Sequence, residues 1–204
     1  DTPQPAITNV VLDLDLDPHE PRLVTRGSYV IENDTDAPLG EVHLRLQNDD
    51  LQLVSLDVQG AEMAREWEEF DYRVYRFATP MAPGERRTIR FETLLTQRGF
   101  KNSGNTTRLV DNGTFVNHIE FTPQIGMNRS GLLSDRTTRR KKGLPAELRP
   151  AKLEDASAQD RNYIGADWVR ADITISTVAD QTPIAPGYKV SDVTEGGRRT
   201  ARFV

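Results

Sequence analysis

Apolar and polar residues alternate with a period of two along much of the first half of the chain. The clearest run extends from Leu12 to Asp17, where leucine and aspartate take turns without interruption. Successive side chains of a strand point to opposite faces, so the leucines share one face and the aspartates the other. This pattern is typical of an antiparallel strand with one face in a core and one in water.

The same alternation predicts a succession of strands between residues 7 and 96, separated by clusters of turn-forming residues. Val42, Leu44 and Leu46 are predicted to point inward, while His43 and Arg45 point outward. Besides Leu12–Asp17 and Val42–Leu46, the predicted strands are Leu23–Asn33, Leu51–Val58, Phe70–Phe77 and Thr88–Leu95.

The second half of the chain is less regular. The stretch from Gly99 to Asn112 is too polar for a core strand, and a strand is expected from Phe115 to Phe121. Short surface helices are expected from Ser134 to about Gly143 and over residues 153–160. Strand alternation returns in Trp168–Thr177, with Val169, Ala171, Ile173 and Ile175 on one face, and two or three strands follow over residues 182–204.

Taken together, these elements predict the fold class. The prediction is an all-β, antiparallel, saddle-like sandwich with one or two short surface helices, forming a single domain over residues 1–204.

Composition narrows the functional classes. The 204 residues are 36% hydrophobic and 28% charged with a net charge of −5, which is typical of a mildly acidic globular protein and suggests no nucleic-acid partner. Cysteine is absent, which excludes disulfides and thiolate metal sites. Every apolar run is broken within a few residues, so no transmembrane span is expected.

The last residues, Thr200 to Val204, alternate like a half-buried strand after the turn Glu195–Arg198, and no cap or polar tail follows them. We therefore expect the chain to be a piece excised from a longer protein. Its catalytic region would lie outside these residues.

Candidate reactive residues are few. None of the three histidines belongs to an H-E-x-x-H pair, the arrangement that grips zinc from one helix face. His118 and Glu120 fall on one face of their predicted strand, where they are either a polar pair facing a cleft, a fragment of a metal site, or part of a solvated face. No G-x-S-x-G elbow supports a nucleophilic serine. No metal site, catalytic residue or cofactor is therefore predicted within this chain.

A basic run lies in the predicted surface helix and consists of Arg136, Arg139, Arg140, Lys141 and Lys142. Clustered positive charge suits phosphate or an anionic lipid surface. The alternative is an ordinary solvated helix face.

The order of several motifs resembles the amino-terminal β domain of zinc aminopeptidases of the aminopeptidase N and leukotriene hydrolase family. The first motifs are Gly27–Asn33, Pro80–Glu85 and Arg98–Phe100, followed by Glu120–Pro123. Further segments look like a bacterial branch in which such a domain is joined to permease-type membrane helices: Asn112–Phe115, Pro123–Gly126, Lys142–Leu144, Asp180–Gln181 and Ile184–Tyr188. The resemblance covers the chain from about Ile7 to Val204.

The resemblance implies a non-catalytic, extracytoplasmic domain that docks against a downstream metallopeptidase-like domain of the same polypeptide and lines its substrate cleft. Zinc would belong to that missing domain, and the parent would be membrane-anchored and possess peptide substrates. In the family, a Q-x-E or Q-x-Q segment helps to bind the substrate's amino group. The matching segment is His118–Glu120, so Glu120 is the implied amine anchor, while His118 departs from the family's glutamine. The family's C-x-D-E-P segment is also replaced, by the longer basic stretch.

Two other functions fit the residues. One is a free-standing β-sandwich module that binds a glycan or protein through the loops of Gly99–Asn112. The other is a small hydrolase that uses a pair of carboxylates among the 31 acidic residues.

Overall fold

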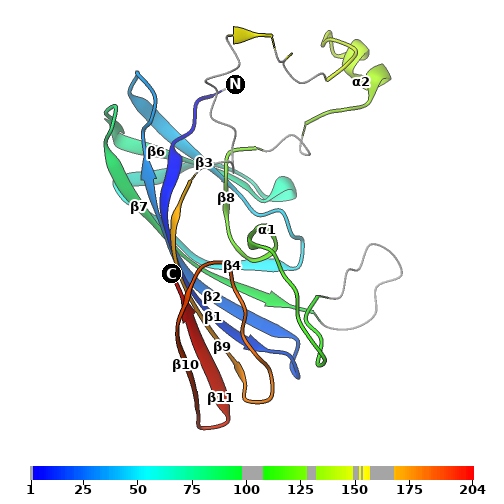
Figure 1. The fold of residues 1–204 in the computed structure, drawn as a ribbon. Coiled ribbons are helices and arrows are strands. Elements are labelled where there is room, and N and C mark those ends of the chain that lie inside the picture. Colours follow the sequence, from blue (N-terminus) through cyan, green and yellow to red (C-terminus); the bar gives the residue numbers. More distant parts are fainter. Residues whose placement is uncertain (1, 98–107, 128–131, 149–151, 153, 157–167) are drawn as a thin grey trace.

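A computed structural model describes residues 2–97, 108–127, 132–148, 152, 154–156 and 168–204. Over these residues the chain is built mainly of strands, as Figure 1 shows. The strands are β1 (Ala6–Asp17), β2 (Arg22–Glu32), β3 (Leu39–Arg45), β4 (Leu51–Val58), β5 (Ala61–Trp67), β6 (Tyr72–Met81), β7 (Arg86–Thr96), β8 (Gln124–Ile125), β9 (Arg170–Val178), β10 (Lys189–Glu195) and β11 (Arg198–Phe203). The helical elements are a 3-10 turn, η1 (Glu68–Phe70), and two short helices, α1 (His118–Phe121) and α2 (Arg136–Lys141).

The larger sheet has the strand order β10-β11-β9-β1-β2-β7-β4. Its pairings are antiparallel except for β1 with β9, which run parallel. Leu12 faces Gly27 of β2 on one side and Ile173 of β9 on the other. The strand β9, from the last fifth of the sequence, is thereby placed beside the first strand.

The smaller sheet has the order β5-β6-β3-β8. In β3, Val42 and Leu44 are buried and the intervening His43 is not, as the alternation predicted. The strand β5 was not predicted from the sequence. It is an edge strand whose residues are exposed or only half-buried on both faces, so it carries no period-two hydrophobic signal.

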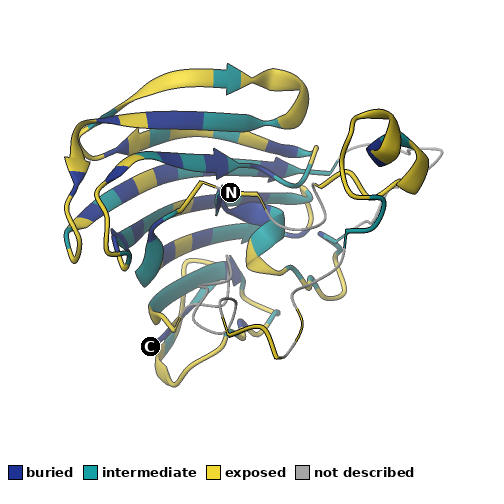
Figure 2. Cartoon of the chain, turned by 90° about the horizontal axis from the view of Figure 1, so that it is seen from above, coloured by how far each residue is buried: buried dark blue, intermediate teal, exposed yellow. Residues whose placement is uncertain are grey.

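The core is formed by the inward faces of both sheets, whose buried residues make one cluster. Figure 2 shows the buried positions alternating with exposed ones along the strands. Within this cluster the rings of Tyr29 and Phe91 are in contact in a tilted arrangement, with centroids 4.9 Å apart and an interplanar angle of 52°. The cluster contains Leu12, Leu14, Leu23, Ile31, Val42, Leu44, Ile89, Leu95, Leu109, Phe121 and Ile125, among others. The prediction of an all-β, sandwich-like fold is confirmed.

The outward face of the larger sheet carries ion pairs between strands, and one of these pairs spans β9. Asp15 of β1 pairs with Arg198 of β11, and Arg202 Nη2 lies 2.6 Å from Asp172 Oδ2 of β9. The aspartates of the Leu12–Asp17 run thus lie on a polar, ion-paired face. This confirms the interpretation of that run as a strand with one face outside the core.

One secondary-structure prediction is wrong. The expected strand Phe115–Phe121 is instead an extended approach followed by the helix α1, because Asn117 and Glu120 form a capping box. The helix predicted near Ser134–Gly143 is confirmed as α2, and residues 182–204 form two strands. The helix predicted over 153–160 falls largely outside the described residues, as does most of Gly99–Asn112.

Candidate functional site

The α1 segment holds both site residues predicted from the sequence, and its local structure follows from the spacing N-x-x-E. Asn117 has extended backbone angles, and its Oδ1 accepts a hydrogen bond from the Ile119 N–H at 3.0 Å. Glu120 Oε2 accepts a hydrogen bond from the Asn117 N–H at 2.8 Å. The two side chains satisfy free amide groups at the start of the turn and so stabilise a helix only four residues long.

The carboxylate of Glu120 also has a cationic neighbour. Its Oε1 lies 2.9 Å from Arg108 Nε, and 18% of the side chain remains exposed. The charge is therefore partly compensated but still borders solvent. Such a carboxylate can receive an ammonium group, provided that the ammonium shares it with Arg108 and the Asn117 amide.

His118 and Glu120 do not form a pair on one face. Residues two apart on a helix project in different directions, so the shared face expected of a strand is absent. His118 is exposed overall, but partial desolvation of its imidazole lowers the pKa of this side chain from its ordinary value. The ring is therefore predominantly neutral at pH 7.

The C-terminal end of α1 and the residues just beyond it are anchored to the larger sheet and to the loop before β4. Asn48 Nδ2 donates to the Glu120 carbonyl at 2.9 Å, and Thr93 Oγ1 donates to the Phe121 carbonyl at 2.7 Å. Just beyond α1, Tyr29 Oη donates to the Pro123 carbonyl, and burial raises the pKa of that phenol. These contacts fix the position of Glu120 relative to β7 and β2.

Sequence reasoning missed the two residues that complete this site, Asn117 and Arg108. The N-x-x-E spacing before Phe121 is a signal that would have identified Asn117. Nothing local marks Arg108, because it reaches Glu120 only through tertiary contacts.

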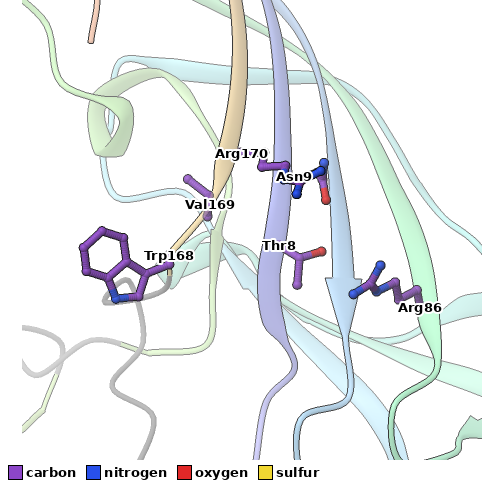
Figure 3. A pocket seen from close by; sticks show the side chains of 6 residues that line it. All are labelled: Thr8, Asn9, Arg86, Trp168, Val169 and Arg170. Atoms are coloured by element: carbon purple, nitrogen blue, oxygen red, sulfur yellow. The ribbon is translucent and has the colours of Figure 1, made fainter. Parts of the chain in front are cut away.

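A second feature is a pocket of about 380 Å³ at the end of the larger sheet where β9 begins, shown in Figure 3. It shares no residue with the α1 segment. One of its lining residues, Trp168, has 99% of its surface exposed. The lining residues are Thr8, Asn9, Arg86, Trp168, Val169 and Arg170.

Exposed apolar side chains gather near this end of the sheet, where β9 starts and β11 ends. Phe203 pairs with Ile173, so Val204 falls close to the start of β9. Tyr188 and Val204 exchange two backbone hydrogen bonds, of 2.7 and 3.0 Å. We call this surface the apolar rim; its members are Trp168, Val169, Tyr188, Val190 and Val204, all between 45% and 99% exposed.

No group of three or more histidine, aspartate or glutamate residues that could hold a metal ion occurs among the described residues. No helix in the described part of the chain is long and apolar enough to cross a membrane.

No family model and no curated protein matches the sequence. Solved structures do match the fold. The M1 zinc metallopeptidase from Deinococcus radiodurans aligns with a TM-score of 0.55 at 14% identity, over 98% of this chain and 38% of that one. A mutant of that enzyme bound to a Tyr-Ser-Ala substrate aligns with a TM-score of 0.56 at 13% identity. A two-domain M1 zinc metallopeptidase mutant bound to L-tryptophan aligns with a TM-score of 0.57 at 12% identity.

The mutant structures also align over 98% of this chain and 39% of their own. The chain thus spans about two fifths of the length of these solved structures. At 12–14% identity the likeness concerns the fold alone. The fold of this chain resembles that of the N-terminal domain of M1 zinc aminopeptidases.

Proposed function

We propose that this chain is the non-catalytic N-terminal β domain of an aminopeptidase-like polypeptide, which docks against a downstream metallopeptidase-like domain and lines its substrate cleft. The observation that carries the proposal is the extent of the fold likeness. It takes in 98% of this chain but only 39% of a zinc metallopeptidase. A zinc ion and the reactive groups would then belong to the downstream domain.

The apolar rim supports a docking role. Exposed apolar side chains gathered at one end of a sheet favour contact with another surface, since burial removes them from water. Val204, the last residue of the chain, lies in the rim itself. Polypeptide that continues from Val204 would therefore emerge against the surface that we expect it to cover.

The proposal is tested by an activity assay with zinc analysis and by the coding sequence beyond residue 204. The purified 204-residue chain, incubated with zinc and an aminoacyl anilide, is expected to show no turnover and no stoichiometric zinc by elemental analysis. The coding sequence is expected to continue past Val204 and to encode an H-E-x-x-H segment. Turnover by the chain alone, or a stop codon at Val204, would refute it; the latter outcome would favour the free-standing binding module.

Within this function we propose Glu120 as the anchor for the substrate's amino group. Its partly exposed carboxylate and fixed position support that role. The test is Glu120→Gln in the polypeptide that includes the downstream domain. Glutamine also completes a capping box, so the fold is retained while the negative charge is lost. We expect KM to rise about tenfold or more, because charge-assisted hydrogen bonds contribute on the order of 1.5–3 kcal/mol.

An unchanged KM for Glu120→Gln would exclude the anchoring role. Asn117→Ala is the matched control, since it weakens the same cap but leaves the carboxylate in place. It is expected to lower stability by about 1 kcal/mol without a comparable change in KM.

We also propose that the polypeptide carries permease-type membrane helices and holds this domain outside the cytoplasm. The support is the motif order described for the sequence. Protease added to intact spheroplasts is expected to cleave the domain within the full polypeptide. Complete protection, lost only on lysis, would contradict an extracytoplasmic location.

A further inference from the structure

The basic segment, residues 132–147, is a small closed unit organised by a buried arginine. Arg139 is the buried residue of α2; its Nε donates to the Pro145 carbonyl at 2.7 Å and its Nη1 to the Leu133 carbonyl at 2.8 Å. The guanidinium thereby ties the chain before α2 to the chain after it. Asp135 caps the helix by accepting a hydrogen bond from the Thr138 N–H at 2.7 Å. These hydrogen bonds all lie within the segment.

The positive charges of this segment therefore divide into two groups. Arg139 is structural, and Arg136 pairs with Glu147. The remaining three, Arg140, Lys141 and Lys142, are exposed and form no ion pair with any described residue. They follow one another at the C-terminal end of α2. In a chain of net charge −5, this is a local concentration of exposed positive charge.

Apolar side chains flank these cations instead of entering a core. Leu132 and Leu133 precede α2 and Leu144 follows it, and each is between 36% and 43% exposed. Figures 1 and 2, viewed along perpendicular directions, both place α2 to one side of the sheets. More than a third of the surface of each of these leucines therefore remains open to solvent.

We propose that residues 132–147 bind the surface of an anionic phospholipid bilayer. Leucines on both sides of a run of arginine and lysine, on one projecting element, are typical of an interfacial membrane-binding segment, in which cations meet headgroup phosphates and apolar side chains enter the acyl boundary. A protein partner fits less well, because lysine is depleted from the cores of protein interfaces. The proposal goes beyond the docking function and does not depend on it.

The test uses the 204-residue chain and vesicles. Sedimentation with vesicles of phosphatidylcholine containing about one third phosphatidylglycerol is expected to retain the chain at 0.1 M salt and to release it as the salt rises. Pure phosphatidylcholine vesicles are expected to retain much less. The triple variant Arg140→Gln, Lys141→Gln, Lys142→Gln is expected to lose roughly a hundredfold in partitioning, at about fivefold per charge.

Two further variants separate lipid binding from simple attraction of anions. Leu132→Ser with Leu144→Ser keeps every charge and is expected to weaken vesicle binding about tenfold, whereas capture of free phosphate would not depend on leucine. Arg65→Gln, Arg76→Gln and Arg90→Gln remove three exposed cations from the sheets and are expected to leave binding unchanged.

Equal retention by neutral and anionic vesicles would overturn the proposal. So would a leucine variant that binds like the parent, or equal losses in the two triple variants. Circular dichroism of each variant verifies that the fold is intact; Arg139 is left unchanged because its loss would open the segment.

Discussion

Glycine at residue 27 is required by packing rather than by backbone conformation. Gly27 of β2 lies opposite Phe91 of β7, and an added Cβ would lie 2.3 Å from Phe91 Cζ and 2.9 Å from Leu12 Cδ2. Both neighbours belong to the core cluster, and the Phe91 ring also contacts the Tyr29 ring. The absence of a side chain at this position is what lets the ring cross the strand.

We expect Gly27→Ala to destabilise the chain by about 1–3 kcal/mol, since the methyl group must displace a buried ring. Urea unfolding followed by circular dichroism measures the effect. Gly40→Ala is the matched control: Gly40 lies in β3, and an added Cβ there meets nothing within 4 Å. The free energy of unfolding of the control variant is expected to lie within about 0.5 kcal/mol of that of the unsubstituted chain. Equal effects at the two glycines would contradict the packing argument.

At the scale of elements, the hairpin of β10 and β11 is tied together by Asp192. Arg199 Nε and Nη2 lie 2.8 and 2.9 Å from its two carboxylate oxygens, and Lys189 Nζ lies 2.6 Å from one of them. Hydrogen bonds from Arg199 first, and then from Lys189, hold the pKa of Asp192 well below its ordinary range.

This lowered pKa predicts an acid-sensitive contribution to stability. As the pH falls, Asp192 is protonated in the unfolded chain first, near a pKa of about 3.9, and in the folded chain only at a lower pH. The contribution is therefore complete above the unfolded value and is lost as the pH falls through the lower, folded value. Asp192→Asn is expected to be less stable than the parent at pH 7, with a difference that shrinks below about pH 4.

Urea unfolding at a series of pH values between 7 and 3 measures that difference. Asp57→Asn serves as the control, because the Asp57 carboxylate is 70% exposed and 3.7 Å from Arg90. Its effect at pH 7 is expected to be small, as is usual for exposed ion pairs. A difference for Asp192→Asn that stays constant down to pH 3 would be inconsistent with the assignment.

At the scale of the whole molecule, the apolar rim is a group of exposed side chains beside Val204. Side chains that touch no core contribute little to folding, so substituting them is expected to change the free energy of unfolding by less than about 0.5 kcal/mol. Trp168→Ser with Tyr188→Ser should therefore preserve stability. Because the rim is exposed, we expect the 204-residue chain to self-associate at high concentration. The double variant should reduce that self-association, measured by sedimentation velocity.

Val54→Ser provides the comparison for the rim, because Val54 is 57% exposed on β4, at the opposite edge of the larger sheet. It is expected to leave self-association unchanged. If the rim variant associates as strongly as the parent, or if it unfolds more easily by several kcal/mol, the rim is not a free docking surface.

Short-range sequence patterns were enough to place most strands. Alternation in Leu12–Asp17 and Val42–Leu46 has a period of two residues, so a window of a few residues contains the whole signal. A window of the same length contains the N-x-x-E capping signal of Asn117 and Glu120. That signal was overlooked because the neighbouring residues also alternate like a strand. The edge strand β5 lies outside the reach of this method, because neither of its faces is buried.

The strand order, the parallel pairing of β1 with β9 and the contact of Glu120 with Arg108 were decided only in three dimensions. Residues more than 150 positions apart pair in β1 and β9, and no local period encodes such a partner. The same holds for the basic segment, whose five cations look alike in sequence. Only the fold separates the buried Arg139 from the exposed Lys141 and Lys142, because burial depends on which backbone carbonyls the folded chain brings within reach.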